Sequence, residues 1–401
     1  MSIGGIVKAM KEIMVSAGRA LKRRIVHRGK YLPRVLPAEK GSAVRGTVLL
    51  SYHARTVAMD ENDPYLDGHS SKWESREIAR IFHDLGYRVE AIDWDNRDFV
   101  PQKEYEVIFD IGFNLQRLSP MMKGRTLKLF HCTGSFWFFQ NQQELLRVEA
   151  MEKRRNAYYS PKRLVIFPEL QEKSLKMADL ATLVGNERTL NTYPERYRSK
   201  MTTVPVSSSK LLYVKKNDLV PEKREFLWYF GSGAVHKGLD LLLEIFSRNL
   251  GLVLNVVGWV GEEKDFIGIY QRELFSLPNI KFHGPLNPNS KEFKRLLDDV
   301  FCFIAPSCSE GISPACVTCL QAGLYPVISR QTGIDLPQGA GHYLEDCSQE
   351  EIEAAIRSVH SLDGTVLARQ ISACQEKALN DYSRENYSAR MRKFLERATS
   401  E

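Results

Sequence analysis

The sequence predicts an α/β protein built from two successive domains, each with a parallel sheet. Three observations support this prediction. The chain has 401 residues, which is the length of about two ordinary domains. Short apolar runs alternate with helical patterns, as they do in β-α-β units. A polar stretch, 207–223, separates an earlier series of such units from a later one.

The positive charge of the chain is concentrated at its N-terminus. The formal net charge is +7, from 56 Lys/Arg and 49 Asp/Glu. Residues 1–40 contain ten Lys/Arg and two Asp/Glu, which leaves 46 basic and 47 acidic residues in the rest. A general nucleic-acid-binding surface is therefore not expected. The seven cysteines show no disulfide-like spacing, and we see neither an apolar run of about 20 residues nor a signal-peptide pattern. A cytoplasmic protein fits best.

The N-terminal segment, 1–40, has the pattern of a basic amphipathic helix. Its apolar residues recur at helical spacing: Ile3, Ile6, Val7, Met10, Ile13, Met14, Ala17, Leu21 and Ile25. Lysines and arginines fill much of the remainder. Such a helix can lie in an anionic membrane surface, so we predict a peripheral attachment through residues 1–28, on the inner face of the cytoplasmic membrane. The alternative is a helix that packs on the protein's own body.

The first domain is expected at 41–206. Its apolar runs predict strands at 46–52, 87–93, 105–111, 126–131, 164–167 and 178–184. Helical patterns fall at 73–85 and 136–156, and Gly86 is placed to end the first of them.

The second domain is expected at 226–380, after a linker at 207–225. Strands are predicted at 226–230, 252–257, 280–282, 300–305 and 326–329, with a helix at about 237–248. Residues 381–401 read as a final helix that crosses back to the first domain.

A glycine-rich turn follows the first strand of the second domain, in Phe230-Gly-Ser-Gly-Ala-Val-His-Lys-Gly238. Glycines let backbone amides approach an anion, and the start of a helix favours negative charge. Lys237 adds a point charge for a phosphate and is expected to be exposed. The alternative is a tight turn with a solvated lysine, since this is neither a P-loop nor a dinucleotide fingerprint.

A second loop follows the strand at 300–305 and contains Ser309-Glu-Gly-Ile-Ser-Pro314. Glu310 should lie just past the carboxyl end of a parallel strand, where open α/β sheets bind ligands. Because both loops sit at carboxyl ends of strands in one domain, Lys237 and Glu310 should face one crevice. The alternative for Glu310 is a solvated loop residue.

Together these motifs resemble those of GT-B glycosyltransferases, in particular the retaining enzymes of family 4. The resemblance rests on Gly231 with His236-Lys237-Gly238, on Phe282-His-Gly-Pro-Leu286, and on Ser309-Glu-Gly-Ile-Ser-Pro314. It is good over 226–345 and only topological over 46–205. It implies two facing Rossmann-like domains with a cleft between them. The N-terminal domain would bind the acceptor, and the C-terminal domain would bind a nucleotide-sugar donor.

The resemblance also implies roles for individual residues. Lys237 would hold the donor's phosphates, and Glu310 would bind the sugar near the reacting carbon. The remaining donor-side candidates are Gly231, Ser232, Gly258, Gly284, Gly311, Ile312, Ser313 and Thr318. His131 would face the sugar from the first domain; the alternative is a core histidine. No metal or other cofactor is expected.

Two positions depart from the family's pattern. Ser232 stands where an arginine usually follows the turn glycine, and Thr318 stands where a second glutamate usually holds the ribose. Arg330 is one residue that would compensate for the missing arginine. Both departures bear on the donor's identity more than on the fold.

The remaining candidates are a group of residues where the resemblance implies that the acceptor would lie, and a pair of cysteines. On the acceptor side they are His53, Arg55, Lys72 and Trp73, with loop packing as the alternative. Cys316 and Cys319 form a lone CxxC, which favours buried small residues over a metal site.

The function that the resemblance implies is transfer of a sugar from a nucleotide sugar to a glycan or lipid-linked acceptor. We expect retention of configuration and a place in cell-envelope polysaccharide synthesis, such as that of lipopolysaccharide. Two alternatives are a non-catalytic sugar- or nucleotide-binding module and a sugar-nucleotide epimerase of the same shape.

Overall fold

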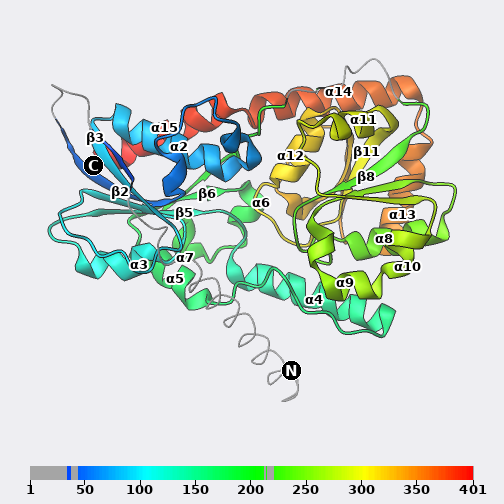
Figure 1. The fold of residues 1–401 in the computed structure, drawn as a ribbon, viewed down its shortest axis with the longest axis horizontal. Coiled ribbons are helices and arrows are strands. Elements are labelled where there is room, and N and C mark those ends of the chain that lie inside the picture. The colour runs from blue at the N-terminus through cyan, green and yellow to red at the C-terminus, as the bar shows by residue number, and fades with distance from the viewer. Residues whose placement is uncertain (1–33, 38–43, 212–213, 215–220, 401) are drawn as a thin grey trace. The chain divides into compact units, whose positions relative to one another are not determined.

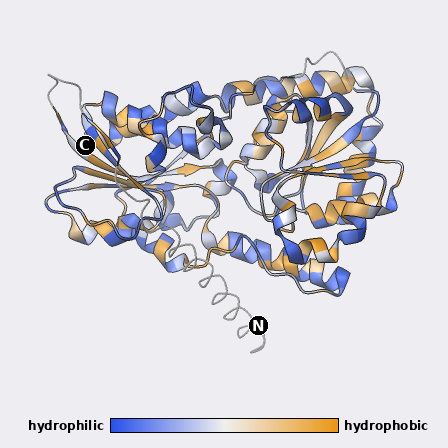
Figure 2. Ribbon diagram, viewed as in Figure 1, coloured by the Kyte–Doolittle hydropathy of each residue, from blue (hydrophilic) through white to orange (hydrophobic). Residues whose placement is uncertain are grey.

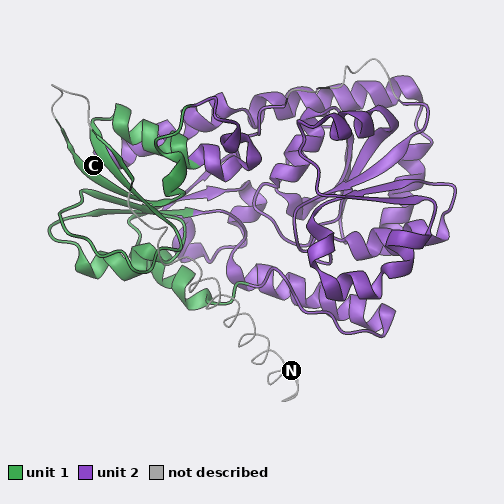
Figure 3. Ribbon diagram, viewed as in Figure 1, with its two compact units in different colours: residues 1–60, 75–131, 165–181 green, residues 61–74, 132–164, 182–401 purple. Residues whose placement is uncertain are grey.

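The computed structural model describes residues 34–37, 44–211, 214 and 221–400. The predicted basic helix at 1–28 lies outside these residues. The chain forms two compact units (Figure 3). Unit 1 contains Met1–Asp60, Ser75–His131 and Val165–Ala181, and unit 2 contains Glu61–Glu74, Cys132–Leu164 and Thr182–Glu401.

The first sheet has seven strands in the order β1-β3-β2-β4-β5-β6-β7. Their bounds are β1 Arg34–Leu36, β2 Gly46–Tyr52, β3 Tyr87–Asp93, β4 Val107–Asp110, β5 Leu127–Cys132, β6 Leu180–Val184 and β7 Met201–Val204. Strands β3, β2, β4 and β5 pair in parallel, whereas β1 runs antiparallel to β3. Strand β2 is buried along nearly its whole length, because helices cover both faces of a parallel sheet.

Helix α2, Ser70–Asp84, shows how the apolar pattern fixes a helix against this sheet. Ile78, Ile81 and Phe82 are fully buried on one face. The helix ends as predicted at Gly86, whose φ of 88° is the left-handed conformation that favours glycine. The other helices of unit 1 are α3 Asn114–Leu118 and α5 Pro168–Met177.

The second sheet lies in unit 2 and has six strands in the order β10-β9-β8-β11-β12-β13, all parallel. The bounds are β8 Glu225–Tyr229, β9 Leu254–Val257, β10 Ile280–Gly284, β11 Val300–Ala305, β12 Tyr325–Ser329 and β13 His342–Leu344. Every residue of β11 is buried. The apolar colour of the central strands in Figure 2 reflects this two-sided burial.

Helices cover both faces of the second sheet (Figure 1). On one face lie α11 Lys291–Asp299, α12 Pro314–Gln321 and α14 Gly364–Asp381. On the other lie α8 Leu239–Arg248, α10 Gln271–Ser276 and α13 Gln349–His360. The remaining helices of unit 2 are α4 Trp137–Arg155, α6 Glu187–Leu190, α7 Glu195–Arg198, α9 Lys264–Ile269 and α15 Arg384–Ser400.

The fold class predicted from the sequence, two Rossmann-like sheets, is confirmed. One predicted strand, 164–167, is wrong: these residues form a half-buried loop before α5. Pro161 and Pro168 flank this apolar run and remove backbone donors that a sheet needs. The predicted domain boundaries remain a prediction. At the C-terminus, α15 packs against β7, and Arg397 donates to Thr202 Oγ1 at 3.1 Å.

Within the part of the chain that the structure describes, no helix is both long and apolar enough to cross a membrane.

Candidate functional site

The glycine-rich turn places Lys237 at the carboxyl end of β8, directly before α8. Gly233 and Gly238 have φ values of 92° and 73°, so both positions favour glycine. A β-carbon at Gly238 would also lie 2.8 Å from the Pro306 carbonyl oxygen. The amide of Lys237 donates to Gly233 O at 2.9 Å, and its carbonyl accepts from Trp228 Nε1 at 3.1 Å. The backbone of Lys237 is therefore held on both sides.

The second loop places Glu310 past the end of β11, the strand that pairs with β8. Two contacts join this loop to the glycine-rich turn. His236 Nε2 lies 2.7 Å from the carbonyl oxygen of Ser309, and the amide of Cys308 donates to His236 O at 3.0 Å. The two loops thus form one unit at the carboxyl edge of the second sheet.

The structure brings Lys237 and Glu310 into direct contact. Lys237 Nζ donates to Glu310 Oε1, and the two form an ion pair. The side chain of Lys237 is only 7% exposed and that of Glu310 is 12% exposed. The two residues are therefore neighbours, and the crevice that they are expected to face stays a prediction. The expectation that Lys237 would be exposed is wrong, because the second loop covers it.

Burial and neighbouring charges act on both members of the pair. Burial would raise the pKa of Glu310, but the charges of Lys237 and His236 outweigh it, so this pKa lies below its usual value. Burial lowers the pKa of Lys237, against the opposing effect of Glu310. The two shifts disagree about the charge of the pair, since the first favours an ionised carboxylate and the second a neutral amine. We take both groups as ionised, because each is the other's nearest counter-charge.

Behind the pair, His236 lies close to a buried carboxylate. Its Nδ1 is 3.6 Å from Glu144 Oε2, and both side chains are almost fully buried. Burial would lower the pKa of His236, but Cys308 and Glu144 outweigh it and raise this pKa to about 9. A protonated His236 would add a second positive charge beside Glu310.

The amides of the glycine-rich turn already bind an anion from the protein itself. Glu263 accepts hydrogen bonds from the amides of Gly233, at 2.5 Å, and Ala234, at 3.2 Å. Tyr159 donates its hydroxyl to the same carboxylate at 2.7 Å. The sequence predicts a ligand anion at this turn, whereas the structure places Glu263 there, a residue that no motif marks.

Gly311 is required by a close approach of backbones. A β-carbon there would collide with the carbonyl oxygen of Val184 and lie 2.9 Å from that of Thr133. The carbonyl oxygen of Glu310 accepts from Ser135 Oγ at 2.7 Å. The loop that carries Glu310 is therefore fixed by the segment after β5 as well as by its own strand.

Other predicted donor-side groups make internal contacts. The amide of Ser313 donates to Thr332 O at 3.0 Å, and its hydroxyl accepts from the amide of Cys316 at 3.5 Å, the N-terminal cap of α12. Thr318 Oγ1 donates to the Pro314 carbonyl at 3.0 Å. Ile312 is buried. Their assignment to the donor stays a prediction.

Gly258 and Gly284 lie at the ends of β9 and β10. The amide of Gly258 donates to Gly284 O at 3.0 Å, and a β-carbon at Gly258 would collide with the carbonyl oxygen of Phe230. The three strand-end loops therefore lie side by side. Gly231 and Ser232 belong to the first of these loops, where the structure confirms no role for either.

Arg330 does not turn toward Lys237. Its guanidinium pairs with Glu345, with nitrogen–oxygen distances of 2.8, 2.8 and 2.5 Å. It is therefore engaged elsewhere, and the missing arginine at Ser232 needs another replacement.

His131 and His53 both belong to unit 1. His131 is fully buried in unit 1 beside Tyr52 and Phe109, and burial lowers its pKa to about 4. These facts fit a core histidine; the catalytic role stays a prediction. His53 exchanges hydrogen bonds with Ser75.

The other acceptor-side residues have different surroundings. Arg55 is an exposed residue of a short 3-10 turn in unit 1. In unit 2, Lys72 lies 3.8 Å above the ring of Tyr65, whereas Trp73 is buried edge-on against Tyr387. Packing explains Trp73 without an acceptor.

The CxxC cysteines are buried in α12. Burial raises the pKa of Cys316 to about 12 and that of Cys319 well above its usual value. Such thiols are inert packing groups.

A cavity of about 410 Å³ lies beside α11, lined in part by Lys281, His283 and Arg295. It contains none of the predicted site residues.

Comparison of the fold with solved structures finds proteins of similar architecture. No protein-family description and no curated protein sequence matches the chain. Sucrose-phosphate synthase from Thermosynechococcus elongatus aligns over 88% of this chain and 99% of its own, with a TM-score of 0.63 and 14% identity. HepE from Anabaena, in complex with UDP-glucose, aligns over 88% and 99%, with a TM-score of 0.56 and 12% identity.

A third structure is the catalytic domain of starch synthase IV from Arabidopsis thaliana, bound to ADP and acarbose. It aligns over 90% of this chain and all of its own, with a TM-score of 0.54 and 12% identity. The chain therefore has the GT-B fold of these proteins. At such low identities the likeness speaks for the fold alone.

Proposed function

We propose that this protein is a glycosyltransferase, which moves a sugar from a nucleotide-sugar donor to a glycan or lipid-linked acceptor with retention of configuration. One observation carries the proposal. Two loops at neighbouring carboxyl strand ends bring the cation of Lys237 against the carboxylate of Glu310, at the place where this class of sheet binds ligands.

The chemistry follows from these two charges. Lys237 stabilises the negative charge that develops on the nucleotide phosphate as its bond to the sugar breaks. Glu310 accepts hydrogen bonds from sugar hydroxyls and favours the positive charge that develops on the reacting carbon. The acceptor hydroxyl attacks from the face that the phosphate leaves, and its proton passes to the departing phosphate. The new glycosidic bond then has the configuration of the old one.

The fold supports the nature of the donor. HepE was solved with UDP-glucose and starch synthase IV with ADP, and both share the GT-B architecture. We extend the proposal to a uridine or adenosine diphosphate sugar for this chain. Its place in cell-envelope polysaccharide synthesis, on the inner face of the cytoplasmic membrane, rests on the basic amphipathic pattern at 1–28.

The experiment is a panel of nucleotide sugars tested on the purified full chain. A donor present at 100 times its dissociation constant stabilises the folded state by about 2.7 kcal/mol, which a thermal-shift screen detects. Donors that shift the transition are then incubated with and without polysaccharide fragments. Release of free nucleotide, followed by chromatography, reports turnover.

The products separate the proposal from its two alternatives. A transferase releases nucleotide and forms a glycoside, or slowly hydrolyses the donor when no acceptor is present. A binding module shifts the transition without any release. An epimerase converts the donor into an isomer without an acceptor. Absence of stabilisation by every donor would refute the proposal.

A further inference from the structure

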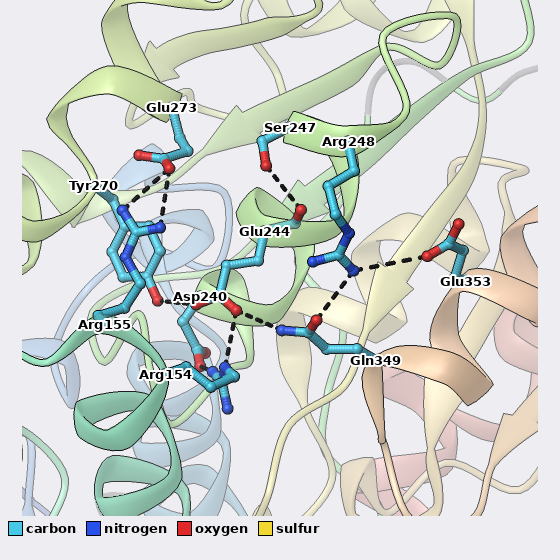
Figure 4. A network of polar contacts seen from close by, with 10 residues as sticks. All are labelled: Arg154, Arg155, Asp240, Glu244, Ser247, Arg248, Tyr270, Glu273, Gln349 and Glu353. Carbon is cyan, nitrogen blue, oxygen red and sulfur yellow. Dashed lines mark hydrogen bonds and ion pairs between the residues drawn. The ribbon is translucent and has the colours of Figure 1, made fainter.

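Two arginines at the C-terminal end of α4 form ion pairs with carboxylates of α8 and α10 (Figure 4). Arg154 Nη2 lies 2.6 Å from Asp240 Oδ2, and its Nε lies 2.8 Å from Glu244 Oε2. Arg155 lies 3.1 Å from Glu273. All three carboxylates are buried. The start of the segment that follows α4 is therefore held against α8 and α10, two of the helices that cover the second sheet.

That segment is held again at Lys162 and Arg163. The amides of both residues donate to Glu144 Oε1, at 2.8 and 2.7 Å. Gln140 Nε2 donates to the carbonyl oxygen of Arg163 at 2.5 Å. Lys162 Nζ pairs with Asp265 at 2.5 Å. Both backbone polar groups of Arg163 are thus bonded by side chains of α4, and its position does not depend on its own guanidinium.

The side chain of Arg163 crosses the glycine-rich turn. Its Cγ and Cδ lie 2.7 and 3.1 Å from the place where a β-carbon of Gly233 would be. A glycine at 233 therefore makes room for the stem of the arginine. Arg163 is exposed, and among the described residues no carboxylate forms an ion pair with it.

The positive charge of Arg163 acts on both members of the ion pair between Lys237 and Glu310. Burial lowers the pKa of Lys237, and Arg163 lowers it further. Arg163 also contributes to the lowered pKa of Glu310, after the larger effects of Lys237 and His236. An exposed arginine whose positive charge acts on a lysine is suited, together with that lysine, to binding a phosphate group.

We propose that Arg163 binds the donor's phosphates together with Lys237, and that it supplies the guanidinium which the turn lacks at Ser232. The replacement comes from the segment after α4, about 70 residues earlier in the chain than the turn itself. This inference rests on the proposed function and names a phosphate-binding residue for its donor.

The test compares diphosphates with nucleosides. Dissociation constants of UDP, ADP, uridine and adenosine are measured by calorimetry for the wild type, Arg163→Gln, Arg163→Lys and Arg330→Gln. Arg163→Gln should weaken binding of the diphosphate by about 10- to 100-fold, the effect of losing a charged hydrogen bond. Binding of the nucleoside should stay unchanged. Arg163→Lys should recover part of the loss, because it keeps the positive charge but lacks the planar guanidinium that can donate two parallel hydrogen bonds.

Arg330→Gln is the matched control, since it also removes one arginine charge from unit 2 but from a residue that Glu345 already occupies. It should bind the diphosphate as the wild type does. Wild-type diphosphate affinity in Arg163→Gln would overturn the inference alone, as would equal losses in Arg163→Gln and Arg330→Gln. An equal loss for nucleoside and diphosphate would overturn it too, by showing a structural role. A wild type that binds neither diphosphate would overturn the proposed function as well.

Discussion

Removal of Lys237 tests whether the site is built around a buried ion pair. In Lys237→Met, the carboxylate of Glu310 keeps its burial but loses its contact with Nζ. Removing one partner of a buried pair costs about 3–5 kcal/mol, because the other charge is left uncompensated. Positive charges of His236 and Arg163 remain near Glu310, so we expect the lower end, about 3 kcal/mol.

A double variant removes both charges of the pair and completes a double-mutant cycle with the two single substitutions. Lys237→Met combined with Glu310→Gln has no buried charge left in the pair, and replacing such a pair by neutral groups is often nearly without cost. The double variant should therefore be more stable than Lys237→Met alone. The coupling free energy between the two positions should reach about 2 kcal/mol.

Urea unfolding at pH 7, followed by tryptophan fluorescence, measures these differences. Lys223→Met is the control, because Lys223 is an exposed lysine that pairs with Asp299, and its loss should not change the unfolding midpoint. If the two single substitutions simply added in the double variant, the pair would contribute no coupling. Our account of why Lys237 and Glu310 are buried together would then be wrong.

Three further predictions concern other parts of the chain. Glu310→Gln should lower the turnover rate by about 100-fold or more, while calorimetry shows nearly unchanged affinity for the free nucleotide; near-normal turnover would remove Glu310 from the site. Arg154→Gln should destabilise the fold by about 3 kcal/mol, the lower end for breaking a buried pair, because it removes the ion pair of Asp240 while the charge of Arg147 remains nearby. Burial raises the pKa of Asp240 to about 6 in the folded protein, above its unfolded value, so the charged form costs stability as the pH rises through that range. The difference in unfolding free energy between Arg154→Gln and the wild type should therefore be large at pH 8 and small toward pH 5. If urea unfolding showed a difference that does not depend on pH, ionisation of Asp240 would not be its cause. Deletion of 1–28 should move the protein from the membrane to the soluble fraction, and high salt should do the same to the full chain; unchanged fractionation would refute the membrane attachment.

Periodicity of apolar residues was enough to predict most of the sheets. The run at 300–305 is β11 as predicted, because a strand buried on both faces must be apolar throughout. The run at 164–167 has the same local composition but lies between two prolines, and it forms a loop. Composition alone therefore predicted a strand at 164–167 that does not form, because prolines on either side lack the backbone N–H groups that a sheet needs.

The contact between Lys237 and Glu310 was also predictable, since neighbouring parallel strands end at one edge of the sheet. Their burial was not, because it depends on how the second loop folds over the first. Arg163, Glu144 and Glu263 were missed altogether. Each comes from a segment distant in sequence and without a motif, and only tertiary packing brings it to the turn.

The carboxylate of Glu263 in the glycine-rich turn limits what a ligand can use there. Because it is attached to the same chain, Glu263 competes for the amides of Gly233 and Ala234 at the high effective concentration of an intramolecular group. A phosphate that used these two amides would have to displace a carboxylate that the fold already holds there. Recognition of a diphosphate must then rest on the cationic side chains around the turn, Lys237 and Arg163, and not on the amides of Gly233 and Ala234.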